Sequence, residues 1–388
     1  MTPVQFGDWP GRVVFGAGAV SRLATVVSNL GASRALVICG STVARGPMLA
    51  RVKSGLGDIA ADVFSEVTGH TPIEMVERGA ALARANKVDV LISVGGGSAI
   101  DAGKAIAIHL ASKGDLSRYA IKYQPGGAMS CERLPQPLIP HIAVPSTAGS
   151  ASDVLPTAAC RDARSRQKLL FWDRALVPQA TVLDPEMAVY ADARLTAATG
   201  MSAVARSIES IYSAKRHPLS TGLALHALRL LRTALPRSIE APGDIEARSA
   251  CQIAAVMSGM AAINAMVSLV HAIGHVVGGR YGLQHGTSHA ILLAPAVRLL
   301  MPVIAEEQRL VCDALTGNGI LDQKRATPSE LIAAFVARLP LPQRLRDVGV
   351  EQGELGKIAQ AVVSDYMMAN LPRPLSENEI LTLLQEAW

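Results

Sequence analysis

Hydrophobic and polar residues alternate differently in the two halves of the chain. In the first half, short runs rich in Val, Ile and Leu recur between longer segments that have helical spacing. The expected strands are residues 11–16, 34–40, 61–67, 88–94, 141–145, 168–173 and 180–186. The expected helices between them include residues 19–31, 47–53 and 72–86. This alternation of strand and helix predicts a parallel sheet covered by helices on both faces.

From about Arg194 the pattern becomes helical and no strand-like alternation returns. The expected helices are residues 195–214, 219–235, 245–270 and 286–301. A chain of 388 residues is also long for one hydrophobic core. We therefore expect an α/β domain over residues 1–190 and an all-helical domain over residues 191–388.

One apolar stretch, residues 251–279, contains no Asp, Glu, Lys or Arg. Gln252, Asn264, two histidines and two glycines interrupt it, so a buried core helix is favoured over a membrane span. The N-terminus lacks a basic segment followed by an apolar one, so no signal peptide is expected. These features predict a cytoplasmic protein without membrane contact.

Charge and cysteine content narrow the range of partners. The formal net charge is only +5, and the basic residues are scattered, which disfavours nucleic acid and favours small anionic ligands. The five cysteines are widely spaced and contain no CxxC pair, so a disulfide framework is not expected. Free cysteines fit a reducing compartment.

Three glycines directly follow the expected strand 88–94. Gly95, Gly96 and Gly97 stand at a turn from strand to helix, where missing side chains let the backbone approach a pyrophosphate. The helix start would add free N–H groups and a partial positive charge. The spacing matches neither GxGxxG nor GxxxxGK[ST], so a glycine-rich turn required for packing is the alternative.

A second loop, residues 145–153, follows the expected strand 141–145. Ser146, Thr147 and Ser150 carry hydroxyl groups that suit phosphate or ribose contacts at the carboxyl edge of a parallel sheet. A capped turn would explain the same residues.

Four of the nine histidines lie between residues 271 and 289. His271 and His275 are four residues apart and share one face of a helix. The turn-like segment that follows would bring His285 back towards them, and His289 comes four residues later. Clustered histidines indicate metal binding or acid–base chemistry.

In chain order, these segments resemble the iron-containing alcohol dehydrogenase superfamily. The motifs are GGGSAIDAGK, STAGS, TVLDP, TAATGM and HAIGH followed by QHG. The resemblance implies the dehydroquinate synthase-like architecture, with a Rossmann-like N-terminal domain that binds NAD(P) and a helical domain that carries the substrate site. It also implies an NAD(P)-dependent oxidoreductase acting on CH–OH or C=O groups, and a homodimer.

Narrower features resemble the maleylacetate reductases of this superfamily. These are GHTP at residues 69–72, Gly278 with Gly279, and His289 four residues after His285. The narrower resemblance implies reduction of maleylacetate to 3-oxoadipate in aromatic degradation, without a metal.

The resemblance implies a set of residues that hold the cofactor. They are Gly40, Thr42, Gly95, Gly96, Gly97, Ser98, Asp101, Lys104, Ser146, Thr147, Ser150 and Lys168. NAD-preferring relatives carry an acidic residue just after the second strand. Here that segment reads Cys39-Gly40-Ser41-Thr42, with Arg45 close by. We therefore expect NADPH to be accepted as well as NADH.

Two of the four metal-ligand positions of the superfamily are changed in this chain. The resemblance places them at Ser202 and Arg206, and at His271 and His285. A serine hydroxyl is a poor ligand at neutral pH, and arginine offers no lone pair. A unit charge about 4 Å from a dication is worth roughly 8 kcal/mol at an effective dielectric near 20, so losing the carboxylate alone is costly. We predict no tightly bound catalytic metal.

Without a metal, another positive group must stabilise the negative oxygen that forms as hydride reaches a ketone. We expect Arg206, with His271 or His285, to do this and to grip a substrate carboxylate through its fork. The alternative is that Arg206 only pairs with Glu209. The resemblance places a catalytic histidine at His275, the expected proton donor. Further substrate-binding candidates are Ser202, Arg280 and His289, of which His289 also fits a helix interior.

The leading hypothesis is an NAD(P)H-dependent reductase of a small oxo acid. One alternative is an alcohol or aldehyde dehydrogenase with another substrate. A second, from a different class, is a catalytically silent dinucleotide-binding protein, which the intact glycine loop and histidine cluster disfavour.

Overall fold

The computed structural model describes residues 11–69, 71–112, 116–123, 129–162, 167–317 and 326–388. The chain divides into two compact units. One contains residues 11–147 and 151–190, and the other contains residues 148–150 and 191–388. The main transition falls between Tyr190 and Ala191, and residues 148–150 of the second unit interrupt the first in sequence.

The described strands all belong to the first unit. They are β1 (Arg12–Phe15), β2 (Arg34–Gly40), β3 (Ala60–Val67), β4 (Val90–Gly95), β5 (Lys122–Tyr123), β6 (Met129–Ser130), β7 (His141–Pro145), β8 (Thr157–Asp162), β9 (Gln167–Trp172) and β10 (Ala180–Leu183). Its helices are α1 (Leu23–Asn29), α2 (Ser41–Arg45), α3 (Pro47–Leu56), α4 (Ile73–Ala85), α5 (Gly97–Ser112) and α6 (Pro185–Ala188). Short 3-10 turns are η1 (Ala19–Arg22), η2 (Ser117–Tyr119) and η3 (Arg174–Leu176).

The described part of the second unit is helical. Its helices are α7 (Ala193–Tyr212), α8 (Pro218–Glu240), α9 (Ile245–Ala265), α10 (Leu269–Tyr281), α11 (His285–Leu300), α12 (Ala305–Thr316), α13 (Pro328–Ala337), α14 (Leu355–Val363) and α15 (Glu377–Ala387). The 3-10 turns are η4 (Met301–Val303), η5 (Leu345–Val348), η6 (Gln352–Glu354) and η7 (Tyr366–Asn370).

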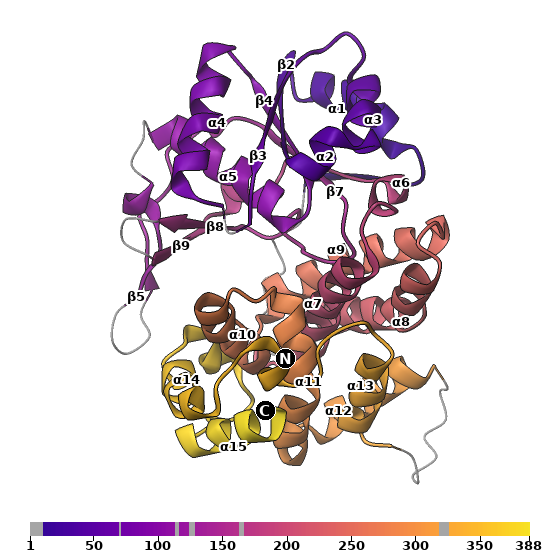
Figure 1. Ribbon diagram of the computed structural model, residues 1–388, viewed down its shortest axis with the longest axis vertical. Coiled ribbons are helices and arrows are strands. Elements are labelled where there is room, and N and C mark those ends of the chain that lie inside the picture. The colour runs from indigo at the N-terminus through magenta and orange to yellow at the C-terminus, as the bar shows by residue number, and fades with distance from the viewer. Residues whose placement is uncertain (1–10, 70, 113–115, 124–128, 163–166, 318–325) are drawn as a thin grey trace. The chain divides into compact units, whose positions relative to one another are not determined.

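The main sheet of the first unit is parallel, with strand order β1-β10-β7-β4-β2-β3. Alternate residues of β2 and β4 enter two separate cores. Leu36 and Leu91 pack towards α4 and α5, whereas Val37 and Ile92 pack towards α1 and α3. Figure 1 shows these two helix pairs on opposite sides of the strands. The predicted α/β domain with helices on both faces is therefore confirmed, as is the helical second domain.

An antiparallel hairpin, β8 with β9, lies outside the main sheet. Only its second strand was expected from the sequence. Residues 157–162, TAACRD, contain few large apolar side chains, so their pattern predicts no strand. Cys160 and Phe171 nevertheless bury in the core beneath α4 and α5, so the hairpin extends that face of the unit.

The apolar stretch 251–279 forms two helices rather than one. Helices α9 and α10 are separated by residues 266–268 and bent by 106°. Among the described residues, one helical run, His285–Val303, is long and apolar enough to cross a membrane, and α9 with α10 would be a second if the bent pair were one span. Most of the apolar stretch of His285–Val303, 72%, is buried inside the protein. Most residues of α9 and α10 are also buried. These helices build the core of the helical unit, as expected for residues 251–279.

Candidate active site

Helix α7 aligns three polar residues on one face. Asp192 caps its start by accepting a hydrogen bond from Leu195 N at 2.7 Å. Ser202, Arg206 and Glu209 follow at spacings of four and three residues, so they point the same way. All three are buried, and Arg206 is only 5% exposed.

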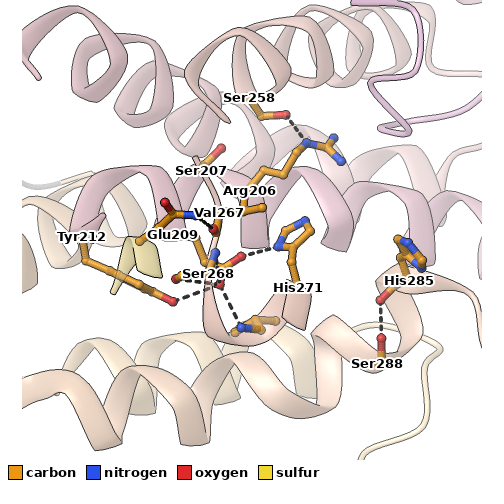
Figure 2. A network of polar contacts seen from close by, with 12 residues as sticks. Arg206, Ser207, Glu209, Tyr212, Ser258, Val267, Ser268, His271, His285 and Ser288 are labelled. Carbon is orange, nitrogen blue, oxygen red and sulfur yellow. Dashed lines mark hydrogen bonds and ion pairs between the residues drawn. The ribbon is translucent and has the colours of Figure 1, made fainter. Parts of the chain in front are cut away.

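Arg206 is held by oxygen atoms from two other segments. Its Nη2 donates to Gly149 O at 2.5 Å, its Nη1 to Ser150 O at 3.4 Å, and its Nε to Ser258 Oγ at 3.3 Å. Figure 2 shows the contact with Ser258. The guanidinium thus links α7 to residues 149–150 and to α9. Each of the three guanidinium nitrogens thereby donates to an oxygen atom of the protein, and the expected grip on a substrate carboxylate stays a prediction.

Glu209 has partners other than Arg206, so the simple pairing considered from the sequence does not form. Its Oε2 binds His271 Nδ1. Its Oε1 accepts from Val270 N at 2.8 Å and from Tyr212 Oη at 3.2 Å. Ser268 donates to the same oxygen from both its N and its Oγ. Figure 2 shows this network around the buried carboxylate.

The four clustered histidines come together at α10 and α11. The ring centroids of His271 and His289 are 4.2 Å apart, those of His289 and His285 5.9 Å, and those of His285 and His275 5.6 Å. His271 and His289 are buried, His275 is partly buried and His285 is exposed. His275 Nδ1 lies 3.6 Å from Asp365 Oδ2.

Burial and the positive charge of Arg206 both keep the buried histidines neutral. Burial lowers the pKa of His271 and of His289 well below the usual value, and the charge on Arg206 lowers both further. Among the described residues, neither ring nitrogen of His289 has a hydrogen-bond partner. His289 is therefore a buried polar group that could bind a ligand.

These residues do not fit a divalent metal. At the two metal-ligand positions of the superfamily on α7, this chain has the hydroxyl of Ser202 and the guanidinium of Arg206. The positive charge of the guanidinium lowers the pKa of His271. Ser202 Oγ is also close to α11, because a Cβ added at Gly286 would lie 3.0 Å from it. Among the described residues, no group of three or more His, Cys, Asp or Glu is arranged to hold a metal ion.

Arg280 lies apart from the cluster in the last turn of α10. It is exposed, and its Nη1 is 3.8 Å from Glu354 Oε2. Arg280 therefore has a surface partner, and its expected role in substrate binding stays a prediction.

The glycine loop of the α/β unit has the features of a nucleotide cradle. Gly95 has a φ of 141°, which favours glycine, and α5 begins at Gly97. A Cβ added at Gly96 would lie 3.2 Å from the Thr147 methyl group. Thr147 is 4% exposed, and its Oγ1 has no hydrogen-bond partner in the part of the chain that the structure describes. An orphaned hydroxyl beside bare glycine backbone fits a phosphate or ribose ligand.

Lys104 and Asp101, two of the residues expected to hold the cofactor, interact with other residues of the α/β unit. Lys104 Nζ donates to Leu155 O at 2.6 Å and to Thr157 O at 2.8 Å, and burial lowers its pKa to about 8. Burial raises the pKa of Asp101, and the charge on Lys104 opposes that change. Lys168, exposed on β9, also interacts with Asp101. The contacts of Lys104 attach α5 to the start of the hairpin, which gives this lysine a structural role.

The turn after β2 offers no acidic side chain. Gly40 ends the strand and α2 begins at Ser41. Arg45 donates from Nε to Ser41 O and from Nη2 to Ser41 Oγ, both at 3.3 Å. Ser41, Thr42 and Arg45 are exposed, so a positive group and two hydroxyls are presented at this turn.

Comparison with known proteins agrees with the fold. Residues 10–185 match the family described as iron-containing alcohol dehydrogenase, and residues 196–388 match the C-terminal domain of the Fe-containing alcohol dehydrogenase family. The chain belongs to the iron-containing alcohol dehydrogenase family. It is an oxidoreductase that acts on CH–OH or C=O groups.

Three known proteins illustrate this kinship. The 1,3-propanediol dehydrogenase of Klebsiella pneumoniae is 29% identical over 96% of both chains. Maleylacetate reductase 2 of Cupriavidus pinatubonensis is 32% identical over 74% of this chain and 70% of its own. The crystal structure of maleylacetate reductase from Agrobacterium tumefaciens superposes with a TM-score of 0.82, at 27% identity, over 100% of this chain and 99% of the other.

Proposed function

We propose that the protein is an NAD(P)H-dependent reductase of a small oxo acid, with maleylacetate as the first substrate to test. The similarity to two maleylacetate reductases supports this substrate class. The similar 1,3-propanediol dehydrogenase acts, according to its name, on a small neutral diol. Neutral aldehydes are therefore the comparison substrates.

The main support for this proposal is the positive charge of Arg206. This residue brings a permanent positive charge to a buried site whose two buried histidines are neutral. Such a site favours an anionic substrate. It also favours negative charge on the oxo oxygen, which accumulates whether the carbonyl or a double bond conjugated to it is reduced.

The other roles follow from position and exposure. His275 is partly buried beside Asp365 and is the proposed proton donor, with His285 next to it. The ring nitrogens of His289, which have no hydrogen-bond partner among the described residues, are the proposed contacts for a polar group of the substrate. Ser202 lies on the same face of α7 as Arg206.

A nicotinamide cofactor supplies the hydride when it is bound. The proposed contacts are the glycine loop and the hydroxyls of Ser146, Thr147 and Ser150. The Ser41–Arg45 turn would accept the 2′-phosphate of NADPH. Lys104 would act indirectly, by fixing α5 against the hairpin. A cytoplasmic homodimer completes the proposal.

The test is oxidation of NADH and NADPH with maleylacetate and, separately, with lactaldehyde and 3-hydroxypropanal. We expect kcat/KM for maleylacetate to exceed that for either neutral aldehyde by at least tenfold. Turnover of the neutral aldehydes alone would contradict the oxo-acid assignment. No turnover with any carbonyl would contradict the reductase itself.

A further inference from the structure

Helix α10, which carries His271 and His275, begins at an irregular turn. Met266 has a φ of 64°, which is unfavourable for a side chain other than glycine. Asn370 Nδ2 donates to Val267 O at 2.8 Å, and Ser213 Oγ donates to Ala265 O. Such a turn persists only if its surroundings hold it in place.

The first N–H groups of α10 need a partner, and α10 does not provide one. Ser268, at the N-cap position, makes no side-chain capping bond. Glu209 of α7 supplies the missing acceptor, because its Oε1 receives the N–H groups of Ser268 and Val270 at 3.2 and 2.8 Å. A carboxylate at a helix N-terminus also interacts favourably with the helix dipole.

The same carboxylate fixes the ring of His271. With Oε1 occupied by donors, Oε2 binds Nδ1 of His271. We propose that Glu209 is a positioning residue that caps α10 and keeps the hydrogen of His271 on Nδ1, so that Nε2 presents a lone pair. Figure 2 shows the second ring nitrogen of His271 turned away from Glu209, on the side of Arg206.

Charge and burial are consistent with this arrangement. Glu209 is fully buried, and burial raises its pKa to about 7, while the hydrogen bonds from Val270, Ser268 and Tyr212 act in the opposite direction. Backbone N–H groups can only donate, so Oε1 must accept. With the carboxylate ionised, a neutral His271 can satisfy Oε2 only by placing its hydrogen on Nδ1.

The consequence for catalysis rests on the proposed function. As a neutral acceptor, His271 orients a donor at Nε2 and leaves proton donation to His275. Glu209→Gln would reverse this arrangement. The amide oxygen would still accept from α10, but the NH₂ group would face Nδ1 and move the ring hydrogen to Nε2.

The tautomer can be measured without any substrate. Long-range ¹H–¹⁵N spectra of protein labelled at its nine histidines, with His271 assigned by its loss in His271→Gln, report which nitrogen carries hydrogen. We expect hydrogen on Nδ1 in the native protein and in Tyr212→Phe, and on Nε2 in Glu209→Gln. Hydrogen on Nε2 in the native protein would overturn the proposal, whether or not any variant folds.

Kinetics give the second measurement, with maleylacetate and NADH. Glu209→Gln should lower kcat by 10- to 100-fold, as loss of a group that orients a site residue typically does, with little change in KM for NADH. The matched control is Glu246→Gln, since Glu246 is exposed on α9. An unchanged kcat in Glu209→Gln would contradict the positioning role. Inactivity of the native protein would instead contradict the proposed substrate and leave the tautomer result standing.

Discussion

Arg206 stays charged at any pH compatible with folding, yet it is 5% exposed. Buried charge is costly unless hydrogen bonds satisfy it. The carbonyls of Gly149 and Ser150 and the hydroxyl of Ser258 do so here. The same residue therefore connects three segments of the helical unit and brings positive charge to the histidine cluster.

Replacing Arg206 by Ala should lower kcat/KM for maleylacetate by at least 100-fold, because the field that stabilises the oxo oxygen is lost. Arg229→Ala, which removes an exposed arginine paired with Asp313, is the control for general effects of lost charge. Steady-state kinetics on both variants, after circular dichroism confirms folding, is the measurement. Full activity in Arg206→Ala would show that the arginine is not needed for catalysis.

The burial of His141 predicts that the folded protein loses stability in acid. It is 4% exposed on β7, its Nε2 lies 2.9 Å from Ser93 Oγ, and burial lowers its pKa to about 3. Below pH 6.5 the unfolded chain binds a proton that the folded protein refuses, so folding becomes less favourable as the pH falls towards 3. From pH 7 to 4 this group alone should cost roughly 3 kcal/mol.

Urea unfolding of the native protein and of His141→Gln at several pH values measures this contribution. The glutamine cannot titrate, so the free energy of unfolding of the native protein should fall more steeply between pH 7 and 4. Parallel curves for the two proteins would show that His141 takes up its proton without unfolding.

At the scale of elements, the contact between α7 and α11 depends on one glycine. A Cβ at Gly286 would lie 1.5 Å from Ala198 O, so the start of α11 could not approach α7 as it does. Gly286→Ala should lower the free energy of unfolding by about 2 kcal/mol, as overpacking does. Gly222, exposed in α8 with open space around it, is the matched control.

The control substitution should have the opposite sign. Gly222→Ala should raise the free energy of unfolding by about 0.5–1 kcal/mol, because alanine loses less backbone entropy in a helix. Chemical denaturation of both variants tests the pair. Equal effects at the two positions would contradict the close contact at Gly286.

The turn between β2 and α2 predicts cofactor preference. A carboxylate introduced at Ser41 would accept ribose hydroxyls and repel a 2′-phosphate, and it would compete for Arg45. Ser41→Asp should shift the ratio of kcat/KM values at least tenfold towards NADH. Ser54→Asp, exposed on α3, adds the same charge elsewhere. An equal shift in both variants would indicate a general charge effect.

Most elements could be predicted from the sequence because their signal is local. Buried strands such as β2 and β4 are continuous apolar runs, and α7 and α8 have clear helical spacing. The break between α9 and α10 has no such signal, since Met266 is an ordinary helix former held in an unusual conformation by distant side chains.

Only part of the site could be predicted from the sequence, because some of its contacts join residues that are far apart in the chain. The histidines were visible because they cluster in sequence, and Arg206 because it departs from a known motif. The role of Glu209 depends on residues 59 to 62 positions away, which no local pattern reveals. The internal partners of Lys104 are Thr157, which begins the hairpin, and Leu155 just before it, and the first strand of the hairpin has no pattern of its own.

We propose that Arg206 replaces a metal in this oxidoreductase of the iron-containing alcohol dehydrogenase family. The most direct test is turnover of maleylacetate by protein treated with EDTA, before and after addition of Zn²⁺ or Fe²⁺. We expect the same kcat in every condition, because Ser202 and Arg206 cannot complete a metal site. Activity that disappears with EDTA and returns with one of the metals would show that catalysis needs a metal and that Arg206 does not replace it.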